Sequence, residues 1–294
     1  MTSLEILRKV FLDSEVTSGN VILIYGVTTM KSQHIASNPA LEFINSSPIL
    51  DIHHPDIQRL VQIRGWRELS PYARIGAIYD FVRDELAFGY NASDDLPASR
   101  VLADGIGQCN TKGTLFMALL RAVGIPCRIH GFTIDKALQR GAITGVAYQL
   151  APPSILHSWV EVLFEDRWVR LEGFILDKPY LSALQAGFAD VEGSFCGFGV
   201  ATTSLQSPMV DWRGQDTFIQ KEGINQDFGV YDTPDAFYQA QGVNLSGIKR
   251  WLYTRVIRHW MNRNVDGIRQ GRVRPSKRHV QPPAQAGKHL GAHL

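Results

Sequence analysis

The chain has 294 residues, of which 45% are hydrophobic and 20% charged, as expected of a chain that builds a packed core. Its formal net charge of +2 gives little indication of its partners. Three cysteines without a CxxC pair argue against a disulfide framework and a zinc ribbon, and they fit a reducing cytosol.

The N-terminal region predicts neither export nor a membrane anchor. Its longest apolar run, Val21–Val27, lacks a signal-peptide cleavage pattern and is far shorter than the ~20 residues of a spanning helix. No later stretch approaches that length. We therefore expect a cytoplasmic protein without a transmembrane segment, in which residues 1–38 form an N-terminal extension and Met1 or Met30 is the start.

The first strong helix signal lies between Ser70 and Gly89. Ser70 is a good N-cap, Pro71 suits the first helical position, and apolar residues recur at helical spacing until Gly89 closes the helix. A short helix is expected to begin at Ser99. The stretch 105–107, Gly-Ile-Gly, is expected to be a flexible approach to the next helix.

That next helix, Asn110–Val123, has apolar side chains almost all round it, so we expect it to be buried on most sides. Gly124 closes it, and Pro126 follows just beyond. A strand is predicted from Cys127 to Ile134. A loop rich in Gly, Ala and Pro is predicted over roughly 135–154.

Two runs rich in Trp, Val, Leu and Phe, Leu156–Phe164 and Trp168–Phe174, predict a β-hairpin. A two-residue turn at Glu165 and Asp166 would place Phe164 opposite Arg167. The same register places Trp159 opposite Glu172.

This register decides where two polar side chains point. Because side chains alternate along a strand, His157 lies on the same face as Trp159 and hence as Glu172, which becomes its diagonal neighbour. A register changed by one residue would move Glu172 to the opposite face of the sheet.

The C-terminal third is predicted to elaborate the core. Residues 180–242 are rich in Gly and aromatic residues and predict short strands and ordered loops. A basic amphipathic helix is predicted over Ile248–Met261, and we expect it to pack against the body with its arginines outward. Its apolar stripe consists of Ile248, Leu252, Val256 and Trp260. The main domain is expected to span 39–262, and residues 263–294 to be a disordered basic tail.

Cys109 follows two glycines and opens the buried helix, which is a favourable position for a nucleophile. A helix N-terminus carries unsatisfied N–H groups and partial positive charge, which favour thiolate and can receive an oxyanion. The alternative is an ordinary buried side chain, since a free cysteine is usually inert core.

A cysteine at a helix start, His157 on a strand and Glu172 on the next strand form a nucleophile, base and orienter. Each has another interpretation. His157 is also compatible with a polar strand edge, and Glu172 with solvent exposure or an arginine partner. The joint order and spacing of the three residues favour the catalytic interpretation.

Three sequence blocks resemble the motifs of the transglutaminase-like superfamily, and together they cover roughly residues 70–175. The cysteine block is Gly107-Gln108-Cys109-Asn110 followed by Ala118-Leu119-Leu120-Arg121-Ala122-Val123-Gly124-Ile125-Pro126-Cys127-Arg128. The histidine and acid blocks are His157-Ser158-Trp159-Val160-Glu161-Val162 and Trp168-Val169-Arg170-Leu171-Glu172.

The resemblance implies an α+β, papain-like core in which a buried helix carrying Cys109 packs on an antiparallel sheet carrying His157 and the acid. It implies Cys109 as nucleophile, His157 as base and Glu172 at the third catalytic position. The third residue is more often Asp in this family, so Asp177 is a fallback acid. The family includes crosslinking acyltransferases, peptidases, amidases, amide-forming enzymes and inactive members.

Other residues carry weaker expectations. Gln108 is a candidate amide donor to an oxyanion, or a plain loop residue. Trp159 is a candidate shield for the imidazole, or ordinary core. Cys127 and Cys196 are expected to be structural. No convincing set of metal ligands is present, and we expect neither a metal nor a cofactor.

The charge distribution suggests one further partner. From Lys249 to Leu294 the chain has eleven Lys and Arg residues and one acidic residue, Asp266, whereas the rest has a net charge of about −8. No nucleic-acid motif accompanies the basic tail, and we expect no specific nucleic-acid binding. Weak binding of the tail to an anionic surface is an open alternative.

Three hypotheses follow. In the first, Cys109 attacks an amide or peptide carbonyl and forms a thioester, which water or an amine resolves. In the second, the fold is a non-catalytic module whose cleft binds a peptide or protein. The third is an adaptor whose salt-sensitive binding to anionic surfaces disappears when the residues after Gly267 are deleted.

Overall fold

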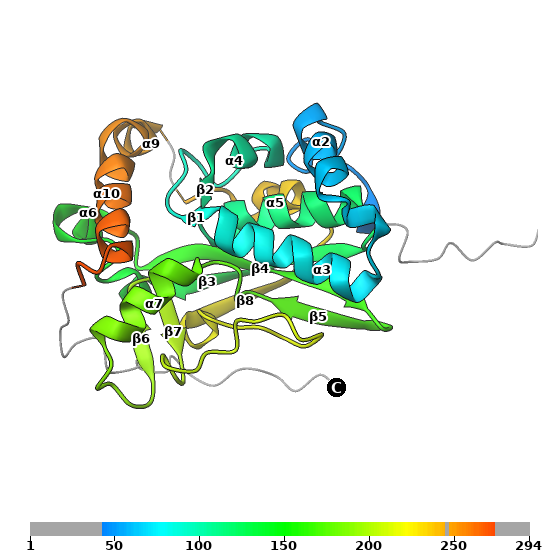
Figure 1. The fold of residues 1–294 in the computed structure, drawn as a ribbon. Helices are drawn as coiled ribbons and strands as arrows, with labels where there is room; N and C mark the ends of the chain where they lie inside the picture. The colour runs from blue at the N-terminus through cyan, green and yellow to red at the C-terminus, as the bar shows by residue number, and fades with distance from the viewer. Residues whose placement is uncertain (1–42, 245–246, 274–294) are drawn as a thin grey trace, which may run out of the picture. The chain divides into compact units, whose positions relative to one another are not determined.

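The computed structural model describes residues 43–244 and 247–273, all within the unit Asn38–Leu294, one of the two units into which the chain divides. A four-stranded antiparallel sheet has the order β5-β4-β3-β8, with helices on one of its faces (Figure 1). The predicted α+β class is confirmed. Its strands are β5 Arg167–Leu171, β4 Ser154–Phe164, β3 Cys127–Asp135 and β8 Ile224–Tyr231.

The β4–β5 hairpin has the predicted register. Glu161 pairs with Arg170, and Phe164 pairs with Arg167. The turn residues Glu165 and Asp166 have φ values of 49° and 58°, the left-handed conformation that a type I′ hairpin turn requires at both central positions. The turn and the alternating apolar strands therefore specify the same pairing.

Strand β8 lies on the other side of β3. The sequence predicted only short strands and loops here, because the exposed side chains of β8 give it no buried alternating pattern. Helix α8, Pro234–Gln241, follows it and packs on the same part of the sheet. Gly131 of β3 gives the Phe237 ring of α8 the space that a side chain would fill. A side chain at this position would clash with the ring.

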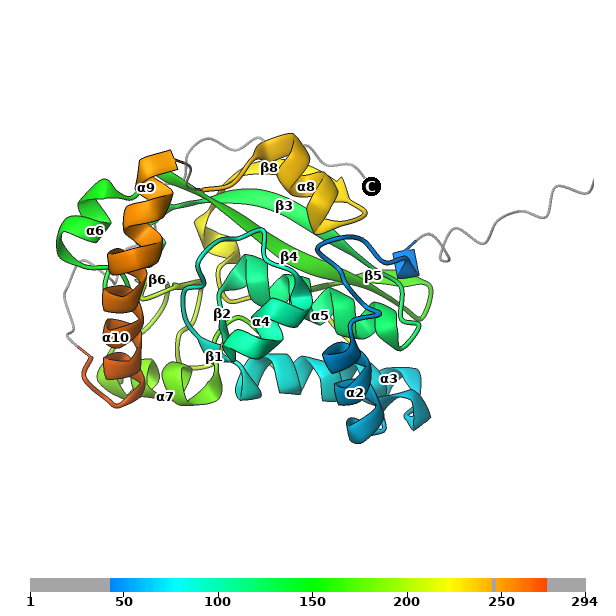
Figure 2. The same cartoon turned by 90° about the horizontal axis from the view of Figure 1, so that it is seen from above.

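Helices that precede β3 in the chain cover one face of the sheet (Figures 1 and 2). They are α2 Pro55–Arg64, α3 Pro71–Asp80, α4 Ala98–Asp104 and α5 Cys109–Ala122, with a 3₁₀ turn at Trp66–Glu68 between the first two. Helix α5 packs against β4 and β3. Its residues from Cys109 to Arg121 are all buried, as predicted.

Three local expectations in this layer are corrected. The helix begun at Pro71 ends in a π-helical turn at Phe81–Glu85, and β1, Ala87–Phe88, follows before Gly89. β1 pairs in parallel with β2, Ile106–Gly107, which the sequence assigned to a flexible approach. Ser99 lies inside α4 rather than capping it, and its hydroxyl donates to Asp51 (2.5 Å). Tertiary pairing overrides the local signal in each case.

Two stretches read as loops contain helices. The loop after β3 contains a 3₁₀ turn, Lys136–Gln139, and the short helix α6, Gly145–Leu150. Helix α7, Lys178–Gly187, begins after β5 with Asp177 as its N-cap. The rest of that region is closer to the prediction: a small hairpin of β6, Phe195–Gly197, and β7, Val200–Thr202, and then a 3₁₀ turn at Lys221–Gly223.

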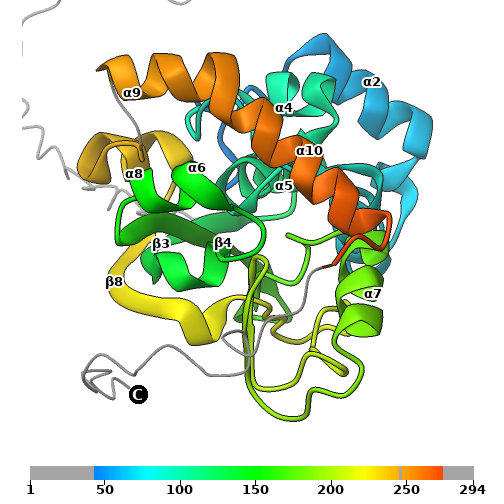
Figure 3. The same ribbon diagram turned by 90° about the vertical axis from the view of Figure 1, so that its left-hand side faces the viewer.

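The C-terminal helix differs from its prediction in length and orientation. It comprises α9 Gly247–Leu252, a π-helical stretch Tyr253–Ile257 and α10 Arg258–Arg269, and it crosses one side of the fold (Figure 3). Met261, Val265 and Ile268 form its buried face. The described members of the predicted inward stripe are exposed rather than buried: Leu252, Val256 and Trp260 are 40%, 56% and 48% exposed.

Beyond residue 262, the end of the predicted domain, Val265 and Ile268 of this helix belong to the main core. The predicted extension 1–38 and the tail beyond Val273 lie outside the described residues.

Candidate active site

Cys109 is the first residue of α5 and is 7% exposed. Gln108 caps the helix: its side-chain oxygen accepts from the Asn110 N–H (2.9 Å), and its own N–H donates to the Thr111 hydroxyl (3.1 Å). A side chain at Gly107 would come within 2.7 Å of Lys112 Cγ. Glycine there allows the tight entry that puts the cysteine at the positive end of the helix.

His157 and Glu172 form a fully buried pair. The imidazole Nε2 lies 2.6 Å from Glu172 Oε1, and neither side chain has exposed surface. Glu172 directly follows β5, so the diagonal placement expected from the hairpin register is what the structure has.

The second oxygen of Glu172 is held by the backbone of a distant segment. Oε2 accepts from the N–H groups of Ile219 and Gln220, each at 2.9 Å. The Glu172 N–H donates to the Thr217 carbonyl (2.9 Å). Sequence reasoning missed this segment, because backbone donors leave no side-chain signature. The longer side chain of Glu is accommodated here by contacts at both oxygens.

Cys109 interacts with the imidazole of His157. Burial lowers the pKa of the imidazole, but the nearby Cys109 and Glu172 raise it more, to about 10. The ring's Nδ1 is buried and forms no hydrogen bond with a described residue. The thiol donates instead to Gln108 Oε1 (3.2 Å). Since Glu172 occupies Nε2, Nδ1 is the nitrogen left for proton exchange with the thiol.

Asn110 links the cysteine helix to the histidine strand on both sides of His157. Its Nδ2 donates to the Leu156 carbonyl (3.2 Å), and its Oδ1 accepts from the Ser158 hydroxyl (2.9 Å). Asn110 is fully buried. In the sequence Asn110 was the start of a predicted helix and part of the cysteine block, with no role of its own; a polar residue in a helix that is apolar all round was the available signal.

The weaker candidates are placed differently from one another. The Gln108 amide donates to Asp94 (2.5 Å) while its oxygen faces the thiol, so this amide is not aimed at an oxyanion. Trp159 is 5% exposed and packs on Phe132, whose ring lies 6.3 Å from that of His157. Trp159 therefore contacts Phe132, and Phe132 in turn lies beside the imidazole of His157.

The fallback acid, Asp177, makes its contacts with other residues than His157. Asp177 caps α7, accepts from the Phe88 N–H (2.7 Å) and forms a two-point ion pair with Arg269 (3.0 and 2.8 Å). Glu172, rather than Asp177, is the acid that contacts His157.

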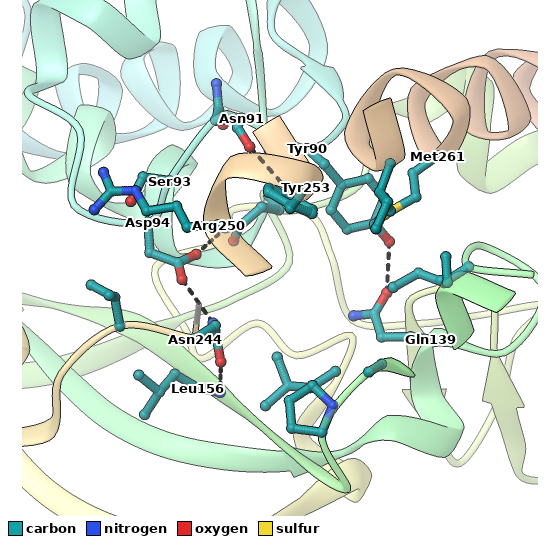
Figure 4. Close-up of a pocket in the computed structure, with 18 of the residues that line it drawn as sticks. Tyr90, Asn91, Ser93, Asp94, Gln139, Leu156, Asn244, Arg250, Tyr253 and Met261 are labelled. Carbon is teal, nitrogen blue, oxygen red and sulfur yellow. Dashed lines mark hydrogen bonds between the residues drawn. The ribbon is translucent and has the colours of Figure 1, made fainter. Parts of the chain in front are cut away.

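A cavity of about 220 Å³ opens beside Cys109 (Figure 4). Its walls come from the loop after β1, from β3 and β4, from the α6 region and from the C-terminal helix. His157 is not among its lining residues. These are Tyr90, Asn91, Ala92, Ser93, Asp94, Gln108, Cys109, Ile134, Gln139, Ile143, Ala147, Ala151, Pro152, Ile155, Leu156, Val243, Asn244, Arg250, Leu252, Tyr253, Ile257 and Met261.

Within the described part of the chain, no three His, Cys, Asp or Glu side chains are grouped so that they could hold a metal ion. No helix among these residues is long and apolar enough to cross a membrane. Cys109, Cys127 and Cys196 form no disulfide. Burial raises the pKa of the Cys127 and Cys196 thiols to about 11, as suits structural side chains.

Residues 63–173 match the transglutaminase-like superfamily. This segment is a transglutaminase-like domain by that match. The matched segment contains all three residues of the candidate site and ends just after Glu172. No curated protein matches the chain in sequence.

Two solved structures are similar to part of this chain. One is a protein from Cytophaga hutchinsonii whose assignment as a cysteine protease is itself provisional: 13% identity, TM-score 0.38, 67% of this chain and 48% of the other covered. The second is red sea bream transglutaminase: 18% identity, TM-score 0.25, 45% and 25% covered. This chain thus spans about half or less of either protein. Similarity at this level indicates neither an activity nor a substrate, so both are argued from the residues of the site.

Proposed function

We propose that this transglutaminase-like chain is a cysteine enzyme that transfers the acyl group of an amide or peptide to water or to an amine. The observation that carries the proposal is the buried His157–Glu172 contact of 2.6 Å together with the interaction of the same imidazole with Cys109. A buried imidazole oriented by a carboxylate and adjacent to a thiol is a nucleophile–base–orienter set.

In the proposed first half-reaction, His157 Nδ1 takes the thiol proton, and Cys109 Sγ attacks the carbonyl carbon. The carbonyl electron pair moves onto oxygen as the C–S bond forms. The N–H of Cys109, which as the first helical residue has no intrahelical acceptor, is the proposed donor to that oxyanion. The intermediate then collapses, the C–N bond breaks, and the departing amine takes the proton from Nδ1.

The second half-reaction resolves the thioester. Water or an amine transfers a proton to Nδ1 and attacks the acyl carbon, and the thiolate leaves. Hydrolase and acyltransferase share every residue in these steps, so the proposal covers both, with an amide, peptide or protein as acyl donor. The steps need no metal or cofactor. A cytoplasmic location also stays a prediction.

The deciding experiment is detection of an acyl-enzyme by intact mass after incubation with a library of amides and peptides. We expect a mass increase on Cys109 that is absent in Cys109→Ala and retained in Cys196→Ala, a matched loss of a buried thiol outside the triad. An unmodified Cys109 that is also inert to iodoacetamide would contradict the proposal and favour the second hypothesis, a non-catalytic peptide-binding module.

A specific observation keeps the anionic-surface hypothesis as a second proposal. Trp251, Leu252, Val256 and Trp260 are exposed on the C-terminal helix, and the cationic side chains of Arg255 and Arg263 are exposed beside them. Apolar side chains interleaved with arginines are typical of helices that lie on membranes containing anionic lipid.

Sedimentation with vesicles containing phosphatidylglycerol tests this second proposal. We expect salt-sensitive binding that weakens in the variant Trp251→Glu, Trp260→Glu and persists in Met209→Glu, an equally exposed apolar residue elsewhere. Truncation after Val273 separates the helix from the tail. Equal binding of the double variant and the wild type would rule out the helix face.

A further inference from the structure

The cavity beside Cys109 has a defined size and lining that the proposed reaction by itself does not require. Cys109 is one of its lining residues, so a group bound there lies next to the carbonyl under attack. At about 220 Å³ it is larger than the ~150 Å³ that accommodates benzene in a buried apolar cavity. It is smaller than the ~300–1,000 Å³ of a site for a complete small ligand. Its size fits one substituent of a substrate.

Most of the wall is aliphatic. Ile134, Ile143 and Leu156 are each 9% exposed or less and contribute from β3, the α6 region and β4. Tyr253, Ile257 and Met261 complete the wall from the C-terminal helix. Binding an apolar group against this wall is favourable by about 25 cal/mol per Å² of apolar surface removed from water.

The polar side chains in the wall bond to one another or to the backbone. Tyr90 donates to Gln139 (2.7 Å), and Asn244 donates to Asp94 (2.8 Å), two bonds that Figure 4 shows. The Tyr253 hydroxyl donates to the Asn91 carbonyl (3.2 Å). Because these side chains already have hydrogen-bond partners within the protein, they offer little to a polar substituent of a substrate.

The charged residues of the wall do not reverse its apolar character. Burial raises the pKa of the Asp94 carboxyl, which disfavours its charged form, although three amide neighbours act against this. Arg250 is about 45% exposed and lies 3.5 Å from Asp95, so it belongs to the opening.

We infer that this cavity binds an apolar group of about six to ten carbon atoms attached near the carbonyl that Cys109 attacks. The group is either an aliphatic acyl chain or a large apolar side chain of a peptide. The inference rests on the proposed function, because it places this group on the acyl substrate. The C-terminal helix, through Ile257 and Met261, then takes part in substrate selection.

Alkylation of Cys109 by a series of N-alkyl iodoacetamides tests the inference without any turnover. The thiolate displaces iodide from the same carbon in every reagent, so the chain attached to nitrogen is the variable. We expect N-hexyl iodoacetamide to alkylate Cys109 at least tenfold faster than iodoacetamide, relative to the ratio of the two rates with free cysteine. Intact mass over time gives the rates.

Three variants locate the effect. In Ala147→Phe and Ala151→Phe the new ring fills part of the cavity, so the ratio of N-hexyl to unsubstituted rate falls toward that of free cysteine. Ala73→Phe adds the same atoms on the exposed surface of α3 and should keep the wild-type ratio. Met261→Ala enlarges the cavity and should shift the preferred chain to greater length, which misfolding cannot mimic.

The outcomes separate the inference from the function. A Cys109 that reacts with all reagents at the ratio of free cysteine overturns the inference and leaves the proposed function intact. A Cys109 inert to every reagent overturns both. An alkyl preference that Ala147→Phe and Ala151→Phe leave unchanged in folded protein places the binding group elsewhere and also overturns the inference.

Two substrate series then identify the source of the apolar group. N-acyl amides of increasing chain length are compared with acetylated peptides that carry Gly, Leu or Phe next to the cleaved bond. Faster acylation of Cys109 along the first series assigns the cavity to an acyl chain, and along the second to a peptide side chain. No dependence in either series overturns the inference.

Discussion

At the residue scale, Glu172 contacts two other parts of the chain, one with each carboxylate oxygen. One oxygen contacts His157 at 2.6 Å, and the other accepts two backbone N–H groups, from Ile219 and Gln220. A shorter Asp at this position would lose one of the two sets. The carboxylate therefore fixes the ring and also stabilises the positive charge on the imidazole.

Replacing Glu172 by Gln should change how the reaction responds to pH. Burial lowers the pKa of His157, whereas Cys109 and Glu172 raise it above its ordinary 6.5, to about 10. The protonated ring is needed to protonate the departing amine, so amide turnover should fall as the pH rises through that raised pKa. Without the Glu172 charge, the fall should begin at lower pH, and the maximal rate should drop by about 10²-fold or more.

The measurement is kcat/KM against pH for the amide that acylates Cys109. Asp177→Asn is the matched control. That carboxylate binds Arg269 and not His157, so its loss should alter stability but leave the alkaline limb in place. An alkaline limb that moves with Asp177 and not with Glu172 would reverse the assignment of the acid.

At the element scale, Asn110 links α5 to β4 by two hydrogen bonds. Its two contacts flank His157, to Leu156 and Ser158, and they are fully buried. The cysteine and histidine belong to different elements, and this link joins those elements next to both residues. Asn110 is thus a positioning residue.

Asn110→Ala should leave the Leu156 carbonyl and the Ser158 hydroxyl without their partner. We expect the free energy of unfolding to fall by about 1–3 kcal/mol, measured by urea denaturation. The rate of Cys109 alkylation in the folded variant should also fall, because the thiol loses its fixed place beside the imidazole. Ser158→Ala removes only one contact and should have the smaller effect on both. Unchanged alkylation in a destabilised variant would reduce Asn110 to a purely structural role.

The face of the sheet that points away from α5 carries a charged network across three strands. Glu161 of β4 binds Arg128 (2.7 Å) and His130 (2.9 Å) of β3, and His130 also contacts Asp227 of β8 (2.8 Å). Burial raises the pKa of the Glu161 carboxyl, but His130 and Arg128 lower it more, to about 2.

This network predicts a loss of stability in acid. Because the pKa of Glu161 is lower in the folded chain than its ordinary 4.5, its contribution is fully present above about pH 4.5. It is lost as the pH falls toward 2, and its full size is on the order of 3 kcal/mol. Urea denaturation at pH 7 and pH 3 should show a smaller difference for Glu161→Gln than for the wild type. An equal difference would contradict this assignment.

At the scale of the whole molecule, the C-terminal helix and the matched segment together line the cavity beside Cys109. The helix supplies one wall of the cavity, and its Arg269 pairs with Asp177 at the start of α7 (2.8 Å). The superfamily match ends at residue 173, so this wall of the cavity lies outside the matched segment.

Truncation measures what the helix contributes. A chain that stops after Asn262 loses the buried Val265 and Ile268 and the Arg269 pair, at ~1.5–3 kcal/mol for each buried side chain. We expect a clear fall in Tm and weakened alkyl selectivity at Cys109. A chain that stops after Val273 keeps these contacts and should match the full-length protein. Equal Tm values for the two truncations would support the domain boundary predicted at 262.

The sequence by itself determined the features that depend on local order. Helix α5 and its burial, β3, the β4–β5 hairpin and its register, and the superfamily all followed from periodicity, turn chemistry and motifs. The contact of His157 with Glu172 followed as well, because alternation along two adjacent strands fixes which side chains share a face.

The tertiary structure alone decided the features that join distant segments. β8 beside β3, the backbone donors at residues 219 and 220, the Asn110 link and the Asp177–Arg269 pair all connect residues far apart in the chain. The exposure of Leu252, Val256 and Trp260 belongs with them: periodicity shows that a helix has two faces, but only packing against Met261, Val265 and Ile268 selects the buried one. Local sequence encodes the pattern of a segment, whereas its partners are chosen by burial across the whole fold.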